Sequence, residues 1–414
     1  MKNKLISPDF YPNFEKDDYA LIRKILKSKN EWINGEELET LKFELKKFYP
    51  NSEIFLFSTE RGALEFFLRF YLKDKKNKKV AIQGFTCFVV PKAIINAGGI
   101  PVFVDIKDGY LNFTIDELYE VYKKNPDISV VILQNTFGVP NELDEFISFC
   151  KERNILLIEN LAHSFNAKYK GIFLGNFGDI ALISFGRSKV ISGIFGGALI
   201  IKNKEIAENF NLYYENLEVI KNKKWLFKTL LYSYLMQYVR KNYSLYGKFL
   251  GYALKKINLA VLDITEKEKR GFLNEDYIVK KMPNAFAKLV LNQLKKIFKF
   301  SDHREKILKI YLKEGILPYG ENPKNYEFYY LRFPITYSHP KKLIEKLKKY
   351  NIYLGNWYNS PLAPLEKRLD RFGYYYGMCP NAEKLCLTIL NLPTNILTTT
   401  EDVYILIELI KKHL

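Results

Sequence analysis

The sequence predicts an α/β protein in which a mostly parallel sheet lies between layers of helices. Short apolar runs, each long enough for one strand, alternate along residues 53–201 with segments of helical periodicity. The runs at 130–133, 155–158 and 180–183 are apolar at successive positions, as in strands that are buried on both faces. This alternation is typical of a sheet covered by helices on both sides.

Each element can be placed in chain order from its periodicity. The expected strands cover residues 54–57, 80–82, 101–105, 130–133, 155–159, 180–183 and 196–201. The expected helices cover residues 59–72, 89–97, 115–124, 142–153 and 284–311. In the first of these helices Leu64, Phe67 and Leu68 share one face, and Gly98-Gly99 ends the second.

Strand and helix signals alternate again over residues 327–414. A chain of 414 residues exceeds the usual size of a single core, so we expect two domains. The large domain would cover residues 1–298, with an insertion at about 210–275, and the smaller α+β domain would cover residues 299–414. In a parallel sheet ligands bind beyond the carboxyl ends of the strands, which is where Thr59, Phe85, Gln134, Asn160 and Lys189 fall.

Composition limits the classes of function. The formal net charge of +18 favours anionic partners, but no nucleic-acid-reading motif accompanies it, so nucleic acid is not expected. The four cysteines form no CxxC pair and the four histidines no HExxH motif, so neither a metal site nor a disulfide framework is expected. Pro8 and Asp9 come too early for a signal-peptide core, and no charge-free apolar run approaches the ~20 residues of a spanning helix. We therefore expect a cytoplasmic location.

Lys189 is the strongest candidate for covalent chemistry. It follows the apolar run 180–183 and the small residues Ser184 and Gly186, and a second apolar run follows it at 196–201. Desolvation and a nearby cation such as Arg187 would lower the pKa of this lysine, which would make it a nucleophile. The alternative is an exposed lysine in a turn, which is common in a chain with 64 lysines and arginines.

Residues 221–256 form a basic, aromatic-rich segment without any Asp or Glu. Lysines alternate there with large apolar residues such as Trp225 and Phe227 and with several tyrosines. One interpretation is a peripheral contact with the inner face of the membrane, with the lysines facing anionic headgroups. The other is that the aromatic face packs on the protein's own large domain or on a partner subunit, with solvated lysines.

Several motifs together resemble the DegT/DnrJ/EryC1/StrS family of sugar aminotransferases, which are fold-type-I enzymes dependent on pyridoxal 5'-phosphate (PLP). In chain order these motifs are residues 59–64 (TERGAL), 85–87 (FTC), 99–105 (GIPVFVD), 134–138 (QNTFG), 158–163 (IENLAH), 178–180 (GDI), 184–189 (SFGRSK) and 391–394 (NLPT). The resemblance runs from about residue 50 to the C-terminus. It implies the fold-type-I PLP-transferase fold, with a mostly parallel sheet and a smaller C-terminal α+β domain.

By this resemblance Lys189 would bind PLP covalently and later carry the proton to the substrate carbon. Ser184 and the backbone of Glu60 and Arg61, at the start of a helix, would bind the cofactor phosphate, and a helix N-terminus favours an anion. The Arg61 guanidinium could reach the phosphate or point away as a surface charge, and Arg187 carries the same ambiguity. His163 would lie beside the ring hydroxyl, unless it is a half-buried histidine satisfied by the backbone.

The chain departs from the family pattern at the cofactor ring. Asn160 stands where the family has the aspartate that keeps the pyridine nitrogen protonated, and an amide cannot supply that charge. Its neighbour Glu159 is a poor substitute because adjacent residues on a strand face opposite sides. Cys87 stands where an aromatic residue stacks on the ring, a role that Phe85 or Phe88 could take.

The resemblance also implies a substrate site and partners. Trp357 and Tyr358 would lie near the substrate, or else form an aromatic pair in the core. The implied activity is transfer of an amino group from an amino acid to a nucleotide-linked keto-sugar, in surface polysaccharide or amino-sugar biosynthesis, by a homodimer. Because of Asn160, the alternative is a catalytically impaired or non-catalytic family member that acts as a binding or scaffold protein.

Overall fold

The computed structural model describes residues 4–9, 11–271, 274–321 and 323–413. Residues 1–3 lie outside these ranges, and they are part of the N-terminal stretch in which no signal-peptide core is expected. A seven-stranded sheet at the centre has the strand order β1-β10-β9-β6-β5-β2-β4. Its strands are β1 (Glu53–Phe57), β2 (Lys79–Gln83), β4 (Ile100–Val104), β5 (Ile128–Gln134), β6 (Leu156–Asn160), β9 (Ile180–Ser184) and β10 (Gly197–Ile201).

The sheet is mostly parallel. Strand β10 pairs antiparallel with both β1 and β9, whereas β9, β6, β5, β2 and β4 pair with one another in parallel. The α/β class and the mostly parallel sheet predicted from the sequence are therefore confirmed. Short strands complete smaller sheets: β3 (Thr86–Cys87), β7 (Lys168–Tyr169), β8 (Ile172–Phe173), β11 (Tyr326–Glu327), β12 (Phe333–Thr336), β13 (Leu362–Ala363) and β14 (Ile389–Leu392).

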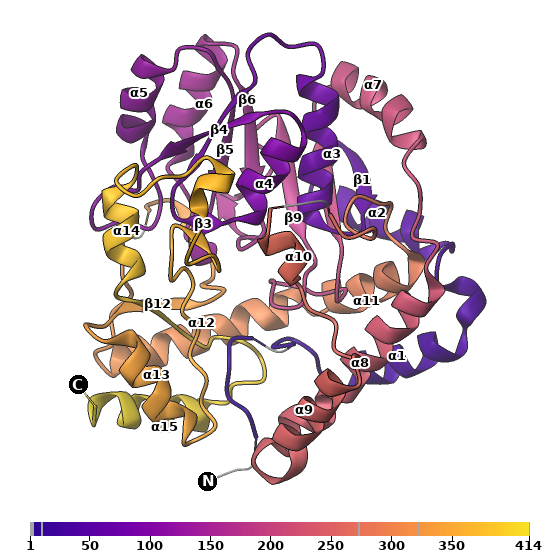
Figure 1. Cartoon of the computed structure of the whole chain (residues 1–414), viewed down its shortest axis with the longest axis vertical. Helices are drawn as coiled ribbons and strands as arrows, with labels where there is room; N and C mark the ends of the chain where they lie inside the picture. Colours follow the sequence, from indigo (N-terminus) through magenta and orange to yellow (C-terminus); the bar gives the residue numbers. More distant parts are fainter. Residues whose placement is uncertain (1–3, 10, 272–273, 322, 414) are drawn as a thin grey trace.

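Helices cover both faces of the central sheet (Figure 1). In the first half of the chain they are α1 (Lys16–Lys27), α2 (Glu37–Lys46), α3 (Glu60–Leu72), α4 (Val89–Asn96), α5 (Ile115–Lys124), α6 (Leu143–Glu152) and α7 (Lys204–Glu215). The remaining helices are α8 (Lys223–Lys241), α9 (Lys248–Lys256), α10 (Glu266–Lys269), α11 (Asn284–Leu294), α12 (Ile297–Lys313), α13 (Pro340–Lys348), α14 (Pro380–Cys386) and α15 (Thr400–Lys411).

Two features of the helices differ from the sequence expectation. The helix expected over residues 284–311 is interrupted at Lys295 and Lys296, which separate α11 from α12. Helices α1 and α2, which were not predicted, precede β1 and bury Ile22 and Leu41 in an apolar core that also contains residues of α5 and α6. None of the helices in the described ranges is long and apolar enough to cross a membrane.

Successive strand residues enter two separate cores, which explains why the strands are apolar at every position. In β6, Ile158 belongs to the cluster that includes α3 and α4, whereas Leu157 belongs to the cluster that includes α5 and α6. The same alternation puts Glu159 on the α5 and α6 side, where it accepts backbone hydrogen bonds from Gly175 and Gly178. Asn160 therefore faces the opposite side, as the period of a strand requires.

The C-terminal part of the chain packs beside the sheet and contributes to its first core. Strand β12 pairs with β14, and β13 pairs with β3 at the edge of the site described below. Figure 1 shows α12, α13 and α15 of this part below α4, and α14 beside the sheet. The division into domains at residue 298 stays a prediction; the boundary falls beside the start of α12.

Candidate active site

A cavity lies at the carboxyl ends of β5, β6 and β9 and at the N-terminus of α3. It brings together ten of the eleven residues that the sequence singled out for a site. They are Glu60, Arg61, Cys87, Asn160, His163, Ser184, Arg187, Lys189, Trp357 and Tyr358. Phe85 does not line the cavity, because its ring is fully buried behind Tyr358, with ring centroids 5.2 Å apart.

Lys189 is half-buried in this cavity, in the loop that connects β9 to β10. Burial lowers the pKa of its amine, and the carboxylate of Glu60 opposes that shift. The cation that lowers the pKa further is Arg332, whereas the sequence argument expected Arg187. The Lys189 Nζ lies 5.7 Å from the centroid of the Trp357 ring. Lys189 is therefore a partly desolvated amine in a cavity, not a fully solvated turn residue.

The N-terminus of α3 presents unpaired backbone N–H groups to the cavity. Thr59 caps the helix by accepting a hydrogen bond from Gly62 N at 3.0 Å, which leaves the N–H groups of Glu60 and Arg61 without intrahelical acceptors. Strand β10 approaches this turn so closely that a Cβ on Gly197 would lie 2.5 Å from Glu60 N. A glycine is therefore required for the helix start to reach the cavity.

Two arginines that line the cavity are paired with one acidic segment, residues 263–268. Arg187 Nε lies 2.7 Å from Asp263 Oδ1, and Arg61 Nε lies 3.0 Å from Glu268 Oε1. Arg61 also donates to the Asp263 carbonyl at 2.9 Å. Neither arginine is an exposed surface charge, because the side chains of Arg61 and Arg187 are only 14% and 9% exposed.

Asn160 contacts the only carboxylate that the start of α3 contributes. Its Nδ2 donates to Glu60 Oε1 at 3.3 Å, and its Oδ1 accepts from Ala162 N at 3.0 Å. Burial raises the pKa of Glu60, while Lys189 and Arg61 oppose the shift. Glu60 and Lys189 thus attract each other in a site whose burial favours the neutral form of both. The cavity contains a carboxyl group beside Asn160, although the strand itself supplies an amide there.

Aromatic rings form one wall of the cavity. Trp357 and Tyr358 stack with centroids 5.8 Å apart, and His163 lies 6.4 Å from Tyr358. His163 is buried, and its Nδ1 accepts a hydrogen bond from Phe137 N at 3.2 Å. Burial, with the charges of Lys189 and Arg332, holds the pKa of His163 well below its usual value, so its ring is neutral.

Sequence reasoning missed Arg332, which is 1% exposed and lies behind this wall. Its guanidinium stacks 3.9 Å from the centroid of the Trp357 ring and donates to Asp9 Oδ1 at 2.6 Å. Asp263 was also missed, although it is the first acid after the acid-free basic segment. Neither residue lies in a recognisable motif. The only sequence signal for Arg332 is its position directly before the apolar residues of β12.

The residues of the cavity fit PLP. Arg187 Nη2 is buried and has no hydrogen-bond partner within the described ranges, so an anion can take that position. The Ser184 hydroxyl and the α3 N-terminus add neutral donors that suit a phosphate. Lys189 supplies the amine for the aldehyde, and Glu60 with Asn160 supplies polar partners for a ring nitrogen.

Comparison with known proteins agrees with this geometry. The model of the DegT/DnrJ/EryC1/StrS aminotransferase family matches residues 12–238 and 264–411. An uncharacterised protein of Methanocaldococcus jannaschii is 27% identical over 98% of this chain and 97% of its own length. The GDP-perosamine synthase of Escherichia coli O157:H7 is 23% identical over 55% of this chain and 62% of its own length, so the match spans less than two thirds of that enzyme.

Solved structures show the same fold. A protein of Streptococcus pneumoniae assigned as a sugar aminotransferase, solved in its PLP form, superposes with a TM-score of 0.70 and 18% identity. The superposition covers 97% of this chain and 98% of that one. The predicted fold-type-I architecture is confirmed by these neighbours.

Proposed function

The chain belongs to the DegT/DnrJ/EryC1/StrS aminotransferase family, and on that premise we propose that it is a PLP-dependent aminotransferase acting on a nucleotide-linked keto-sugar. Aminotransferases of this family are PLP enzymes. The observation that carries the proposal is the half-buried Lys189 in a cavity whose other residues suit a phosphate. The alternative of a non-catalytic family member finds no support in the comparisons.

Four groups of this chain would hold the cofactor. The N–H groups of Glu60 and Arg61, the Ser184 hydroxyl and the Arg187 guanidinium would bind its phosphate, because the helix dipole and the cation both favour an anion. When bound, PLP supplies an electron sink that stabilises negative charge on the substrate carbon.

Lys189 would move the proton. Its pKa is lowered by burial, so at neutral pH a larger fraction of the amine is free to accept a proton than for a solvated lysine. Neutral His163, held by the backbone of Phe137, can donate a hydrogen bond from its other nitrogen without adding charge. The stacked rings of Trp357 and Tyr358 would shield from water the side of the cavity that His163 lines.

Glu60 would supply the negative charge that Asn160 lacks. The Asn160 amide donates to the Glu60 carboxylate, so the two side chains act as one polar unit at the cavity wall. The raised pKa of Glu60 suits a group that shares a proton with a weakly basic partner such as a pyridine nitrogen. On this reasoning Asn160 is no sign of lost activity.

The substrate class rests on charge and on the relatives. A net charge of +18 favours the diphosphate of a nucleotide sugar, and relatives are named as enzymes of such sugars, among them GDP-perosamine synthase. An amino acid would serve as amino donor. We further propose a homodimer, which light scattering of the purified protein would measure.

Borohydride reduction tests the proposal directly. Protein incubated with PLP, reduced and digested should carry a pyridoxyl group on the peptide that contains Lys189. Added glutamate should bleach the absorption of the bound cofactor when the first half-reaction runs. Lys202 is the matched control, because burial also lowers its pKa but it lies outside the cavity.

Accordingly, Lys189→Arg should lose the adduct and the bleaching, whereas Lys202→Arg should retain both. A pyridoxyl group on another lysine, or none at all in folded protein, would contradict the assignment of Lys189.

A further inference from the structure

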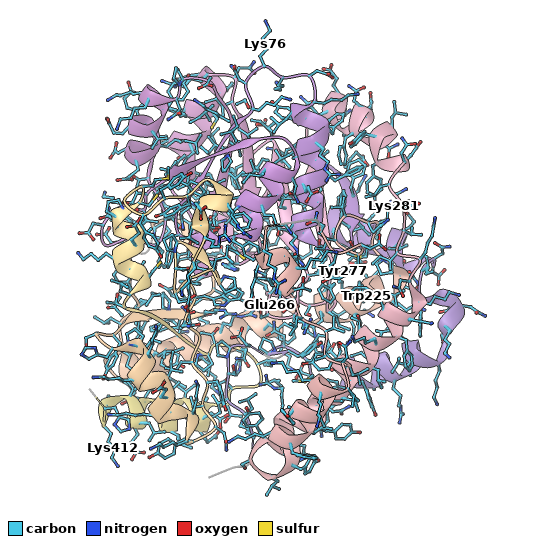
Figure 2. The ribbon with its side chains drawn as sticks, viewed as in Figure 1. Lys76, Trp225, Glu266, Tyr277, Lys281 and Lys412 are labelled. Carbon is cyan, nitrogen blue, oxygen red and sulfur yellow. The ribbon has the colours of Figure 1, made fainter. Side chains whose placement is uncertain are left out.

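The basic aromatic segment at 221–256 divides into two halves with opposite surroundings. In the first half Trp225 stacks on Tyr277 with centroids 4.3 Å apart, and Leu226 and Leu230 are fully buried. Figure 2 shows Trp225 and Tyr277 close to each other. The side chains of Trp225, Leu226 and Leu230 therefore pack on the protein itself.

The second half leaves large apolar side chains in solvent. After α8 a π-helical turn, Tyr243–Gly247, leads into α9. Leu245, Phe249 and Tyr252 are 66%, 75% and 64% exposed, and their spacing puts them on one face. We call these three residues the apolar stripe. The family model matches residues 12–238 and 264–411, so the stripe lies in a part of this chain that the family pattern does not account for.

The face of the π-helical turn and α9 opposite the stripe packs on the rest of the protein. Gly247 and Leu254 are buried, and a Cβ on Gly247 would lie 2.3 Å from the Val239 carbonyl oxygen. A Cβ on Gly251 would lie 3.6 Å from a Val239 methyl group, in ordinary contact. Helix α9 thus packs closely on α8 through small residues, and it lies at the lower end of the molecule in Figure 1. The side chains of the stripe are exposed there.

Cations surround the stripe. Lys241, Lys248, Lys255 and Lys256 are exposed, and none forms an ion pair with a carboxylate of the described ranges. Glu218 and Asp263 are the nearest acids along the chain, so residues 219–262 contain no negative side chain. The surface therefore combines exposed aromatic and aliphatic groups with uncompensated positive charge.

We propose that this surface docks on an anionic lipid bilayer, with the apolar stripe in the headgroup region and the four lysines on the phosphates. An amphipathic helix with lysines beside its apolar face binds such bilayers through both contributions. Two-fold contact between copies of this chain would place lysines against lysines, which the charge pattern disfavours. The proposal is independent of the catalytic activity.

Vesicle flotation with the full chain tests it. Vesicles of phosphatidylcholine mixed with phosphatidylglycerol should carry the protein upward, and vesicles of phosphatidylcholine alone should not. Lys255→Gln/Lys256→Gln should weaken binding about fivefold for each charge removed, and added salt should weaken it too. Phe249→Gln should weaken binding about tenfold.

Matched controls lie on other faces of the molecule. Phe43→Gln on α2 removes a ring that is 65% exposed, and Lys341→Gln/Lys342→Gln on α13 removes two exposed lysines. Both controls should bind anionic vesicles like the unmodified protein. Equal loss in the controls, absence of flotation, or Phe249-dependent self-association in sedimentation velocity without vesicle binding would each overturn the proposal, the last in favour of a second copy as the partner.

Discussion

Removal of the Glu60 carboxylate is the sharpest test of the site's electrostatics. In Glu60→Gln the amide keeps the shape and can still accept from Asn160, but the charge that favours protonated Lys189 is gone. The Lys189 amine and the Glu60 carboxylate form no ion pair within 4.0 Å, so at an effective dielectric of about 20 their charges attract by less than about 4 kcal/mol. Lys189 is half-buried, and solvent screens part of this attraction. We therefore expect the pKa of Lys189 to fall in Glu60→Gln, by less than the unscreened attraction would give.

The sign follows from the ionised form of the lysine. Glu60 raises the pKa of Lys189, so its loss lowers that pKa and the free amine becomes available at lower pH. The assay is the rate at which apo-protein takes up PLP, followed by absorbance across a range of pH. The midpoint of that profile should move to lower pH in Glu60→Gln and stay near its original place in Glu60→Asp.

Two controls make the result interpretable. Glu44→Gln removes a partly exposed carboxylate of α2 that pairs with Lys47 outside the cavity, and it should leave the midpoint unchanged. Thermal melting should show that each variant is folded. An unchanged midpoint in folded Glu60→Gln would refute the idea that Glu60 is the charge partner of Lys189.

Three further comparisons of variants test other features of the protein. Asn160→Asp should add little while Glu60 is present, because two adjacent carboxyl groups share a proton, but it should restore turnover in the Glu60→Gln background. Steady-state kinetics of the unmodified protein, the two single variants and the double variant would check this. Gly197→Ala should lower the free energy of unfolding by about 1–3 kcal/mol and weaken PLP binding, whereas Gly251→Ala, whose new Cβ meets ordinary contacts, should not; urea denaturation and PLP titration measure both. Trp225→Ala should cost about 1–3 kcal/mol of stability, because its half-buried ring stacks on Tyr277, and Phe249→Ala less than about 0.5 kcal/mol. Comparable losses would mean that the two halves of the basic segment are packed alike.

Much of the fold could be predicted because its signals are local. The apolar runs of β5, β6 and β9 and the helix signals after Thr59 and Val89 lie in short stretches of chain, and the structure has elements at these positions. The break at Lys295 and Lys296 was not predictable in this way, since both flanking segments have helical periodicity. Helices α1 and α2 were missed because they precede the first clear strand.

In the candidate site, too, some residues have a local sequence signal and others do not. Lys189 and Asn160 could be singled out because they follow strands, and parallel strands end at one edge of a sheet. The sequence predicted that Phe85 lines the cavity, but its ring is buried behind Tyr358, a residue from a distant part of the chain. Burial and long-range packing decide such details, and neither is written in a local pattern.

The sequence by itself determined the class of fold, the choice of Lys189 as the candidate reactive lysine and the basic character of residues 221–256, since each depends on residue type and spacing along the chain. Only the tertiary structure decided that Glu60 contacts Asn160, 100 residues away in the chain, and that Arg332 is a cation that lowers the pKa of Lys189. It also decided that apolar side chains are buried in α8 but exposed in α9. These are contacts between distant segments, and their energies depend on the separation and burial that folding creates.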